Sequence, residues 1–446
     1  MEKKFYLVVI CLCLFCLPSI LMAQDTAAAA LKWDLQTCLQ YAYKNNIQLR
    51  TLQANTRLSE QDLLLAKAAK IPSLSASVTQ SVINSKNTNP VVGGFQTQAN
   101  VSGNYSINSN WTIYNGGYIN STIRQSNLLL QSSNLDVQAA QNDITLQVTQ
   151  SFLNILLAKE NIVYLQDLVT TSKAQLEQGK QRYDAGSIAR KDYLQLEAQV
   201  ANDQYTLVNA QNAYRQNLVT LKQVLQLPSS VQFDIAAPDT LIAPATVPSL
   251  TEAENAALQT RPEVKNGELG VQIAEAELEK ARAGFRPTVS VGAGLSSGYS
   301  DNQEGVKYFS QIDNNFYQRL GLTISIPIFS NRINKTNVER SKIQIEQARL
   351  SLQGTKTTLD QAVEQAYIDV LNAQAQFDAA TVQWKANQES YHISTEELRL
   401  GAVNTVDLLQ QKNLYVQALQ AYIQAKYNSI LSRKIYDFYT GTPVTL

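Results

Sequence analysis

Two kinds of hydrophobic spacing divide this chain into helical and extended segments. Between residues 118 and 184 the apolar side chains Ile144, Val148 and Phe152 recur at the four-residue step of a helix face. Between residues 101 and 114 apolar and polar residues alternate instead, in the sequence VSGNYSINSNWTIY. Steps of three and four predict an amphipathic helix, and alternation predicts a strand with two different faces. The pattern therefore predicts strands set between long helices.

Four segments share the alternating pattern, and all of them are poor in charge. They cover residues 74–82, 101–114, 289–299 and 320–329. Between residues 71 and 114 the only charged side chain is Lys86, and the polar positions hold Ser, Thr and Asn. Lipid on one face and a water-filled lumen on the other would explain this pattern, which is typical of membrane strands. A solvated antiparallel sheet beneath helices is the alternative.

If the second strand crosses a membrane, its alternating residues face two different environments, lipid on one side and the lumen on the other. The polar residues are expected to face the lumen: Asn104, Ser106, Asn108, Asn110 and Thr112. Aromatic side chains concentrate at the two membrane interfaces of such proteins. The aromatic residues expected there are Tyr105, Trp111, Tyr114 and Tyr299.

The sequence also repeats itself at an offset of 215 residues. Without a gap, this offset places Pro72 on Pro287 and Gly186 on Gly401. The chain is therefore predicted to be a duplicated unit. The first repeat covers 24–227 and the second 250–446, and the proline-rich segment 228–249 links them as an equatorial layer.

Each repeat is predicted to contain the same elements in the same order. A helix (34–70 or 250–285) leads to a β-hairpin (72–114 or 287–329), then to a long helix, a tip turn near Gly186 or Gly401, and a return helix. The long helix 118–184 would run about 100 Å and the return helix 188–226 about 57 Å. The next short helix, 250–285, must therefore complete the way back to the second strand region, stacked end to end on the return helix. A coiled-coil rod fits the helical part equally well.

Composition and targeting signals narrow the class of protein. Lys plus Arg and Asp plus Glu both number 37, so no basic field favours nucleic acid. Residues 1–23 combine two lysines, an apolar core and a final Ala23, which predicts a removable secretory signal. Bulky Phe15 before Cys16 disfavours lipid attachment, and Cys38 would be the only cysteine left after removal. A transmembrane anchor is the alternative, but Pro18 interrupts the apolar core.

Catalytic and cofactor signatures are missing from the sequence. His392 is the only histidine, and no glycine loop suited to phosphate follows a strand. We therefore expect no enzyme, no metal and no cofactor. After the signal no apolar run reaches the roughly 18 residues of a spanning helix, so strands are the expected route through a bilayer. Four strands cannot close a barrel, and several chains would have to share one.

Three features occur in a fixed order along the chain. They are the opening WDLQTCLQYAYKNNIQLRTLQAN, the strands KIPSLSASV and FRPTVSVGA, and the turns RYDAGSIARKDYLQLEAQ and LRLGAVNTVDLLQQKN. Together with the repeat, they resemble the TolC-like outer-membrane factor family. The resemblance implies a mainly α protein with a membrane β part: a homotrimer whose twelve-stranded β-barrel continues into a periplasmic α-helical barrel. It also implies an exit duct in the outer membrane of a Gram-negative bacterium, joined to an inner-membrane pump through a periplasmic adaptor. A secreted or surface-attached coiled-coil structural protein, or an adhesin, is the alternative.

The resemblance also assigns roles to the two turns. Tunnel tips that contact the adaptor are expected at Arg182, Tyr183, Gly186, Ser187, Leu400, Gly401 and Ala402. Candidates for residues that close the tunnel are Arg190, Asp192, Arg399, Asp407 and Gln410. The chain has Leu398, Val403 and Gln410 where relatives place a tyrosine, an arginine and an acid, so the closing contacts of the family do not transfer as a set. Asp192 and Asp407 could instead only cap their helices.

Overall fold

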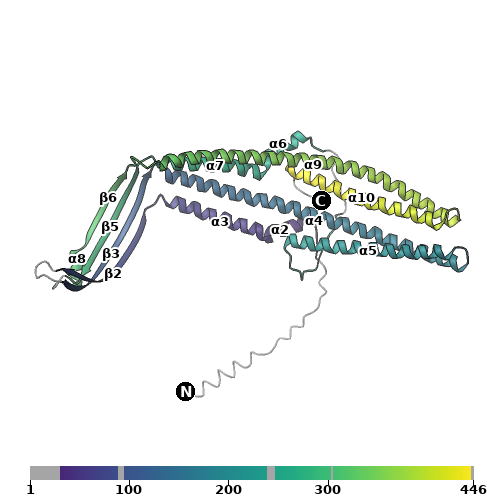
Figure 1. Cartoon of the computed structure of the whole chain (residues 1–446), viewed down its shortest axis with the longest axis horizontal. Helices are drawn as coiled ribbons and strands as arrows, with labels where there is room; N and C mark the ends of the chain where they lie inside the picture. Colours follow the sequence, from purple (N-terminus) through teal and green to yellow (C-terminus); the bar gives the residue numbers. More distant parts are fainter. Residues whose placement is uncertain (1–30, 89–94, 239–246, 303–304, 443–446) are drawn as a thin grey trace, which may run out of the picture.

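The computed structural model describes residues 31–88, 95–238, 247–302 and 305–442. The expected signal 1–23 and part of the linker 228–249 lie outside these residues. The helices form one elongated layer, and a sheet continues it at one end (Figure 1).

The two halves of the chain contain corresponding elements. The first half comprises β1 (Leu31–Trp33), α2 (Leu35–Asn45), α3 (Ile47–Ala68), β2 (Ser73–Thr88), β3 (Phe95–Asn115), α4 (Tyr118–Asp184) and α5 (Arg190–Leu225). The second comprises β4 (Phe233–Ile235), α6 (Leu250–Thr260), α7 (Pro262–Ala283), β5 (Thr288–Ser300), α8 (Tyr308–Asn314), β6 (Tyr317–Ser325), α9 (Ile333–Leu400) and α10 (Thr405–Tyr439). The long helices α4 and α9 have 67 and 68 residues. The duplicated, mainly helical fold is therefore confirmed.

Several element boundaries differ from the prediction. The first helix of each half is broken, at Asn46 and at Arg261, because both residues have extended backbone. The Asn46 side chain caps α3 by accepting from the Leu49 amide at 3.1 Å, and Arg261 precedes a proline, which disfavours helical backbone. The fourth strand ends at Ser325 rather than residue 329, two residues before Pro327. Helix α8 and the parallel pair of β1 with β4 were not predicted.

The helices pack side by side in a layer four helices wide. Near the sheet the order is α9, α7, α4 and α3, and toward the tips it is α9, α10, α4 and α5. The short helices α3 and α5 follow one another along α4 (Figure 1). The helix lengths had instead predicted that the return helix continues into the helix 250–285, but α7 of that segment lies between α4 and α9. The main core surrounds Phe152, Ile155 and Ile423, at the level where α3 and α5 follow one another. α4 therefore lies inside the layer, and α9 forms one of its edges.

The four long strands form an antiparallel sheet in the order β2, β3, β5, β6. An antiparallel sheet is favoured here because a chain that turns back after a long strand can pair directly with that strand. Among the residues that the structure describes, no strand pairs with the outer edge of β2 or of β6. Among the described residues, no helix combines the length and the apolar character needed to cross a membrane.

Candidate functional site: the faces of the sheet and the helix tips

One face of the sheet consists almost entirely of small, uncharged polar residues. In the observed register Asn108 lies between Ser75 of β2 and Gly294 of β5, and Asn110 lies between Ser73 and Gly292. Successive strand residues point to opposite faces, so every second residue belongs to this set. It includes all five residues predicted to face the lumen: Asn104, Ser106, Asn108, Asn110 and Thr112.

Side chains on this polar face bond to one another along the sheet. The hydroxyls of Ser77 and Ser106 lie 2.8 Å apart, and the Asn108 amide donates to Ser106 Oγ at 2.9 Å. The backbone of β3 approaches β5 closely at Gly298, where an added Cβ would lie 2.7 Å from the Gly103 carbonyl. The polar face is therefore packed tightly while its groups remain able to bond to water.

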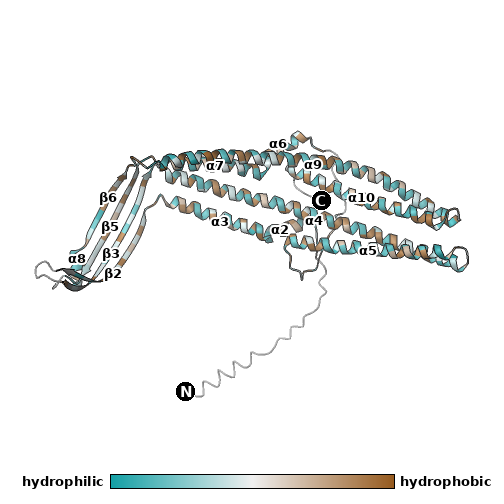
Figure 2. Ribbon diagram, viewed as in Figure 1, coloured by the Kyte–Doolittle hydropathy of each residue, from teal (hydrophilic) through white to brown (hydrophobic). Residues whose placement is uncertain are grey.

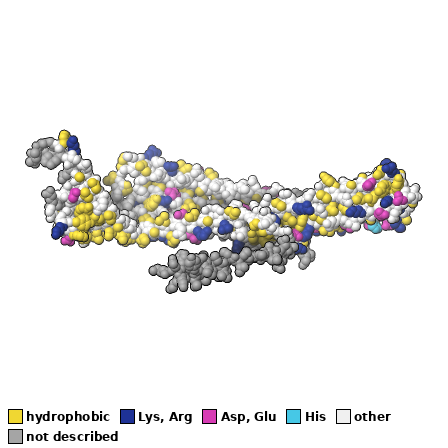
Figure 3. Space-filling model, turned by 90° about the horizontal axis from the view of Figure 1, so that it is seen from below, with side chains coloured by type: hydrophobic (Ala, Val, Ile, Leu, Met, Phe, Trp, Pro, Cys, Tyr) yellow, Lys and Arg dark blue, Asp and Glu magenta, His cyan; other side chains and the backbone are white. Residues whose placement is uncertain are grey.

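The opposite face is apolar and exposed. Tyr105, Ile107 and Trp111 lie on it beside Leu295 and Val291. Figure 2 shows hydrophobic positions along the strands, and Figure 3 shows hydrophobic side chains gathered over the sheet. An exposed apolar surface of this kind is unusual for a protein surrounded by water.

An irregular pairing near the helix end of β3 keeps Tyr114 on this apolar face. Trp111 pairs with Val291 and Tyr114 with Val289, so Ile113 is an extra residue in β3. Strict alternation would have placed Tyr114 on the polar face with Thr112. The β-bulge shifts the parity by one residue.

The four predicted interfacial aromatic residues form two groups on the apolar face. At the end of the sheet nearer the helices, the Trp111 indole donates to the Lys70 carbonyl at 2.8 Å. Tyr114 lies further along β3 toward the helices. At the other end, Gln80 bonds to both Tyr105 and Tyr299, at 2.5 and 3.1 Å. Helix α8 adds Tyr308, whose hydroxyl lies 3.0 Å from that of Tyr105. The sequence analysis missed Tyr308, although the adjacent aromatic pair of Tyr308 and Phe309 marked the segment.

At the far end of the layer, the two tip turns have the same backbone geometry. Gly186 and Gly401 have φ of 70° and 79°, in the left-handed region. After α4, Ser187 N donates to Arg182 O at 2.7 Å and Gly186 N to Tyr183 O at 2.9 Å. After α9, Ala402 N donates to Glu397 O and Gly401 N to Leu398 O. This pair of bonds closes a helix C-terminus most easily when glycine occupies the left-handed position.

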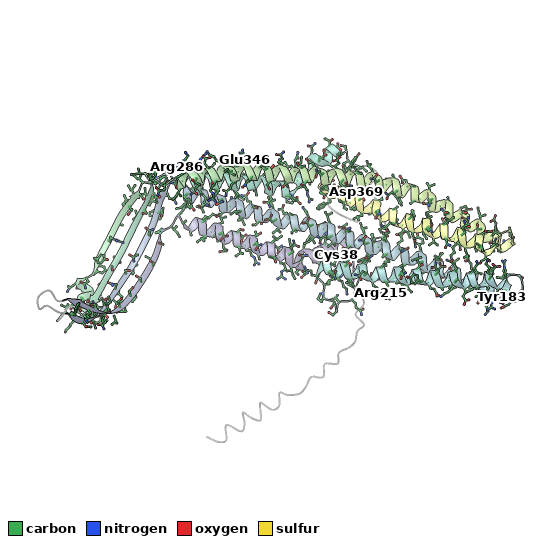
Figure 4. All side chains as sticks on the ribbon, viewed as in Figure 1. Cys38, Tyr183, Arg215, Arg286, Glu346 and Asp369 are labelled. Carbon is green, nitrogen blue, oxygen red and sulfur yellow. The ribbon has the colours of Figure 1, made fainter. Side chains whose placement is uncertain are left out.

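The tips are joined to each other by Arg182. Its guanidinium donates to the carbonyl oxygens of Leu398 and Arg399, at 3.2 and 3.3 Å. These carbonyls end α9, where the helix dipole favours a cation. Tyr183 stacks on Tyr193 of α5, with ring centroids 5.6 Å apart, and Figure 4 labels it at the tip. The remaining tip residues, Ser187, Leu400 and Ala402, are exposed.

The gate candidates do not pair with one another inside the chain. Arg399 bonds to Glu396 at 2.8 Å, and within the described residues no ion pair joins Asp192 or Asp407 to an arginine. Asp192 lies half-buried in the first turn of α5, and Asp407 is exposed in the first turn of α10, beside the cap residue Asn404. Arg190 and Gln410 are also exposed. Pairing between chains stays a prediction.

A buried ion pair, which the sequence analysis did not identify, joins the two helical hairpins nearer the equator. Lys412 of α10 lies 2.7 Å from Asp203 of α5, and both are almost fully buried. Lys412 also donates to Ser172 of α4 at 2.5 Å, and Gln199 donates to the other oxygen of Asp203 at 2.9 Å. Burial lowers the pKa of the Lys412 ammonium, and the bond to Asp203 opposes that shift. The two partners are 209 residues apart, so no local pattern could have paired them.

Comparison with known proteins relates this geometry to a family. A family profile described as outer membrane efflux protein matches residues 38–225 and 254–434, one stretch in each half. The chain belongs to this family. Outer membrane efflux protein BepC of Brucella suis is 22% identical over 412 residues, which cover 91% of this chain and 85% of BepC.

Solved structures show the same fold. The CmeC outer membrane channel of Campylobacter jejuni superimposes with a TM-score of 0.77 at 18% identity, over 91% of this chain and 85% of that one. The outer membrane protein VceC of Vibrio cholerae gives 0.77 at 14% identity, over 92% and 96%. As an outer membrane efflux protein, the chain is an exit duct of a tripartite export system. It lies in the outer membrane of a Gram-negative bacterium and extends into the periplasm.

Proposed function

We propose that three copies of this chain form one duct, which takes its substrate from an inner-membrane pump through a periplasmic adaptor and catalyses no reaction. The observation that carries this proposal is the pair of free strand edges, β2 and β6, beside an exposed apolar face. Lipid cannot satisfy the hydrogen bonds of an open edge, so the sheet must be closed by other chains. Pairing β2 of one copy with β6 of the next closes a ring, and three copies supply twelve strands.

The helical layer has two complementary edges of its own. Exposed apolar residues lie three, seven or eleven residues apart on the outer faces of both edge helices, so each set forms one stripe. On α5 they are Leu194, Tyr205, Val208 and Val219, and on α9 they are Leu371, Val382, Ile393 and Leu400. Contact between the α5 stripe of one copy and the α9 stripe of the next would bury both.

The two faces of the sheet suit the two sides of a membrane barrel. The apolar face would contact lipid, with Tyr105 and Tyr299 at one interface and Trp111 and Tyr114 at the other. The strand between Val289 and Tyr299 is about 33 Å long, and a tilt of about 40° gives it a height of about 25 Å, which is the apolar band of such barrels. The polar face, with Asn104, Ser106, Asn108, Asn110 and Thr112, would then line the lumen.

The helix tips would contact the adaptor and close the duct at rest. Their matching turns expose Tyr183, Ser187, Leu400 and Ala402 around Gly186 and Gly401. Arg182 already ties one tip to the other. Asp192 and Asp407 are free to pair with Arg190 or Arg399 of a neighbouring copy, through contacts that are individually weak enough for a pump complex to break.

Thiol labelling of single cysteines tests the orientation of the sheet. Cys38 is buried and burial raises its pKa to about 12, so it is expected to stay unreactive in the folded protein. A cysteine at Asn108 should react with a small membrane-impermeant reagent, and a cysteine at the neighbouring Ile107 should not. Equal labelling at both positions would contradict the assignment of faces.

Disulfide cross-linking tests the ring. Val78→Cys on β2 would be combined in turn with Gln318→Cys, Leu320→Cys or Leu322→Cys on β6, which lie on the same face. One of these registers should give covalent dimers and trimers, and nothing larger. Monomers in every combination, or a ladder that passes the trimer, would exclude this closure.

A further inference from the structure

The sheet and its junctions with the helices lack carboxylates. Every charged residue between Asp62 and Asp136, between Glu279 and Asp301, and between Asp313 and Glu339 is a lysine or an arginine. Membrane strands explain why charges of either sign are scarce in the sheet, where β2 carries Lys86 and β6 carries Arg319. They do not explain why only cations remain where the strands meet the helices.

Six exposed cations cluster at these junctions, and we call them the basic belt. They occupy the end of α3, the end of α7 and the start of α9, next to the first residues of β2 and β5 and after β6. The members are Lys67, Lys70, Arg282, Arg286, Arg332 and Lys335. Figure 4 labels Arg286 where strands and helices meet.

None of the six forms an ion pair among the residues that the structure describes. Three nearby carboxylates already have other partners: Glu279 pairs with Arg124, Glu277 with Lys280, and Glu339 with Lys342. Arg286 donates to the Gly116 carbonyl at 2.8 Å, which fixes its guanidinium at the turn between β3 and α4. The belt therefore carries positive charge that no ion pair within the described part of the chain neutralises.

Helical geometry places the belt away from the lumen side. Asp62, Leu65 and Ala66 of α3 and the cap residue Ala69 line a groove of about 610 Å³ together with Asn110 and Thr112 of the polar face. Residues three and four apart share a helix face, so Lys67 lies on the other side of α3.

The start of α9 has the same arrangement. A second groove, of about 420 Å³, is lined by Asn334, Asn337 and Ser341, and by Tyr118, which lies on the face of α4 that carries Thr122 and Ser126 of the first groove. Lys335 lies on the opposite side of α9 from these residues. Lys67 and Lys335 therefore share the side of the layer that continues the apolar face of the sheet.

We infer that the basic belt binds the phosphate groups of anionic glycerophospholipids, in the leaflet of the outer membrane that faces the periplasm. This inference rests on the proposed orientation of the sheet in the membrane. Lysine and arginine next to an apolar band reach headgroups with their charged ends while their stems contact apolar surface. Trp111 and Tyr114 lie at the same level, as aromatic residues at a membrane interface do.

The other end of the sheet gives no comparable signal. There Lys307 lies near Asp301 and Asp313 in sequence, so both signs of charge are present. The charge asymmetry between the two ends assigns the lipid contact to the periplasmic side.

Spin-labelled lipids test the inference in reconstituted membranes. The purified oligomer would be placed in phosphatidylcholine bilayers with a trace of spin-labelled phosphatidylglycerol or phosphatidylcholine, and the immobilised fraction of each label measured. The test variant is K67Q/R282Q/K335Q. The matched control, K173Q/K180Q/K385Q, removes three exposed cations from the tip half of the helices.

The parent and the control should immobilise phosphatidylglycerol in preference to phosphatidylcholine by about two-fold or more at low salt. The belt variant should lose most of this preference, and about 1 M salt should abolish it in the parent. A parent without preference, or a belt variant with the full preference, would overturn the inference. Absence of any immobilised lipid would instead contradict the membrane orientation itself. A belt variant that changes only the ion selectivity of the open duct would place these cations in the lumen and also overturn the inference.

Discussion

The long helices α4 and α9 are copies of one another and both bury the seam that contains Val148 and Val363, yet they bury different amounts of a second apolar stripe on another side of the helix. The repeat places Leu153 and Leu156 of α4 on Ile368 and Leu371 of α9. In α4 these leucines are 1% and 3% exposed, and in α9 their counterparts are 42% and 48% exposed. α4 has helices on both sides, whereas α9 is an edge of the layer. The same sequence pattern therefore forms a core inside one chain and a surface suited to contact between chains.

The buried ion pair of Lys412 with Asp203 also breaks the equivalence of the two halves. The repeat places Lys412 on the exposed Glu197, and Asp203 on the buried Ala418. Lys412→Met should lower the free energy of unfolding by about 3–5 kcal/mol, because it leaves the Asp203 carboxylate buried without a counterion. Urea unfolding of the detergent-solubilised protein measures this.

Two further variants control for that prediction. K412M/D203L removes both charges and should return close to the stability of the parent, since a buried ion pair often contributes little over apolar packing. Glu197→Gln, at the repeat-equivalent exposed position, should change stability by less than about 0.5 kcal/mol. A double variant as unstable as Lys412→Met would show that packing, and not the unpaired charge, dominates.

The second apolar stripe offers a direct comparison between α4 and α9. Leu156→Ala should destabilise the single chain by about 2–5 kcal/mol, because it opens a cavity in the core. Leu371→Ala should leave the unfolding of the chain nearly unchanged and lower the temperature at which the oligomer dissociates on an unheated gel. Equal effects of both variants on chain unfolding would contradict the assignment of α9 to an interface.

Equivalent substitutions at the two tips should have equal effects on export if export depends on the turn that both tips share. Gly186→Val and Gly401→Val each force a branched side chain into left-handed backbone, at a cost of about 1–2 kcal/mol. No atom lies within 4 Å of either added Cβ, so the strain should stay at the turn. Pump-dependent export should fall while assembly persists, and asparagine at the same positions should be milder. Loss of export from only one of the two tips would show that the adaptor distinguishes them.

The smallest effect is expected from the two aspartates beside the tips. Asp407→Asn should raise the open probability of single channels in planar bilayers or weaken their preference for cations, since Asp407 is exposed toward any neighbouring copy. Asp192→Asn, at the half-buried equivalent position, serves as the comparison. Recordings of both variants that match the parent would leave the aspartates with a helix-capping role alone.

The predicted helices and strands were correct where the sequence pattern was long and depended only on nearby residues. The helix expected over 118–184 is observed over the same residues, because a long proline-free tract with a four-residue seam leaves no other regular structure. The five polar residues of β3 share one face for the equally local reason that strand residues alternate. The break at Asn46 was missed because asparagine is common on helix surfaces and acts as a cap only when the chain turns there.

The sequence by itself determined that the chain contains two copies of one unit, four two-faced strands and two glycine turns. Alternation, repetition and the positions of glycines can be read along the chain without knowing any tertiary contact. The tertiary structure alone decided which copy of the second apolar stripe is buried and that an extra residue at Ile113 turns Tyr114 to the apolar face. It alone also brought Lys412 to Asp203 and gathered six cations from three helix ends into one belt. These outcomes depend on residues that lie far apart in the chain, and their contact free energies exist only after the layer has formed.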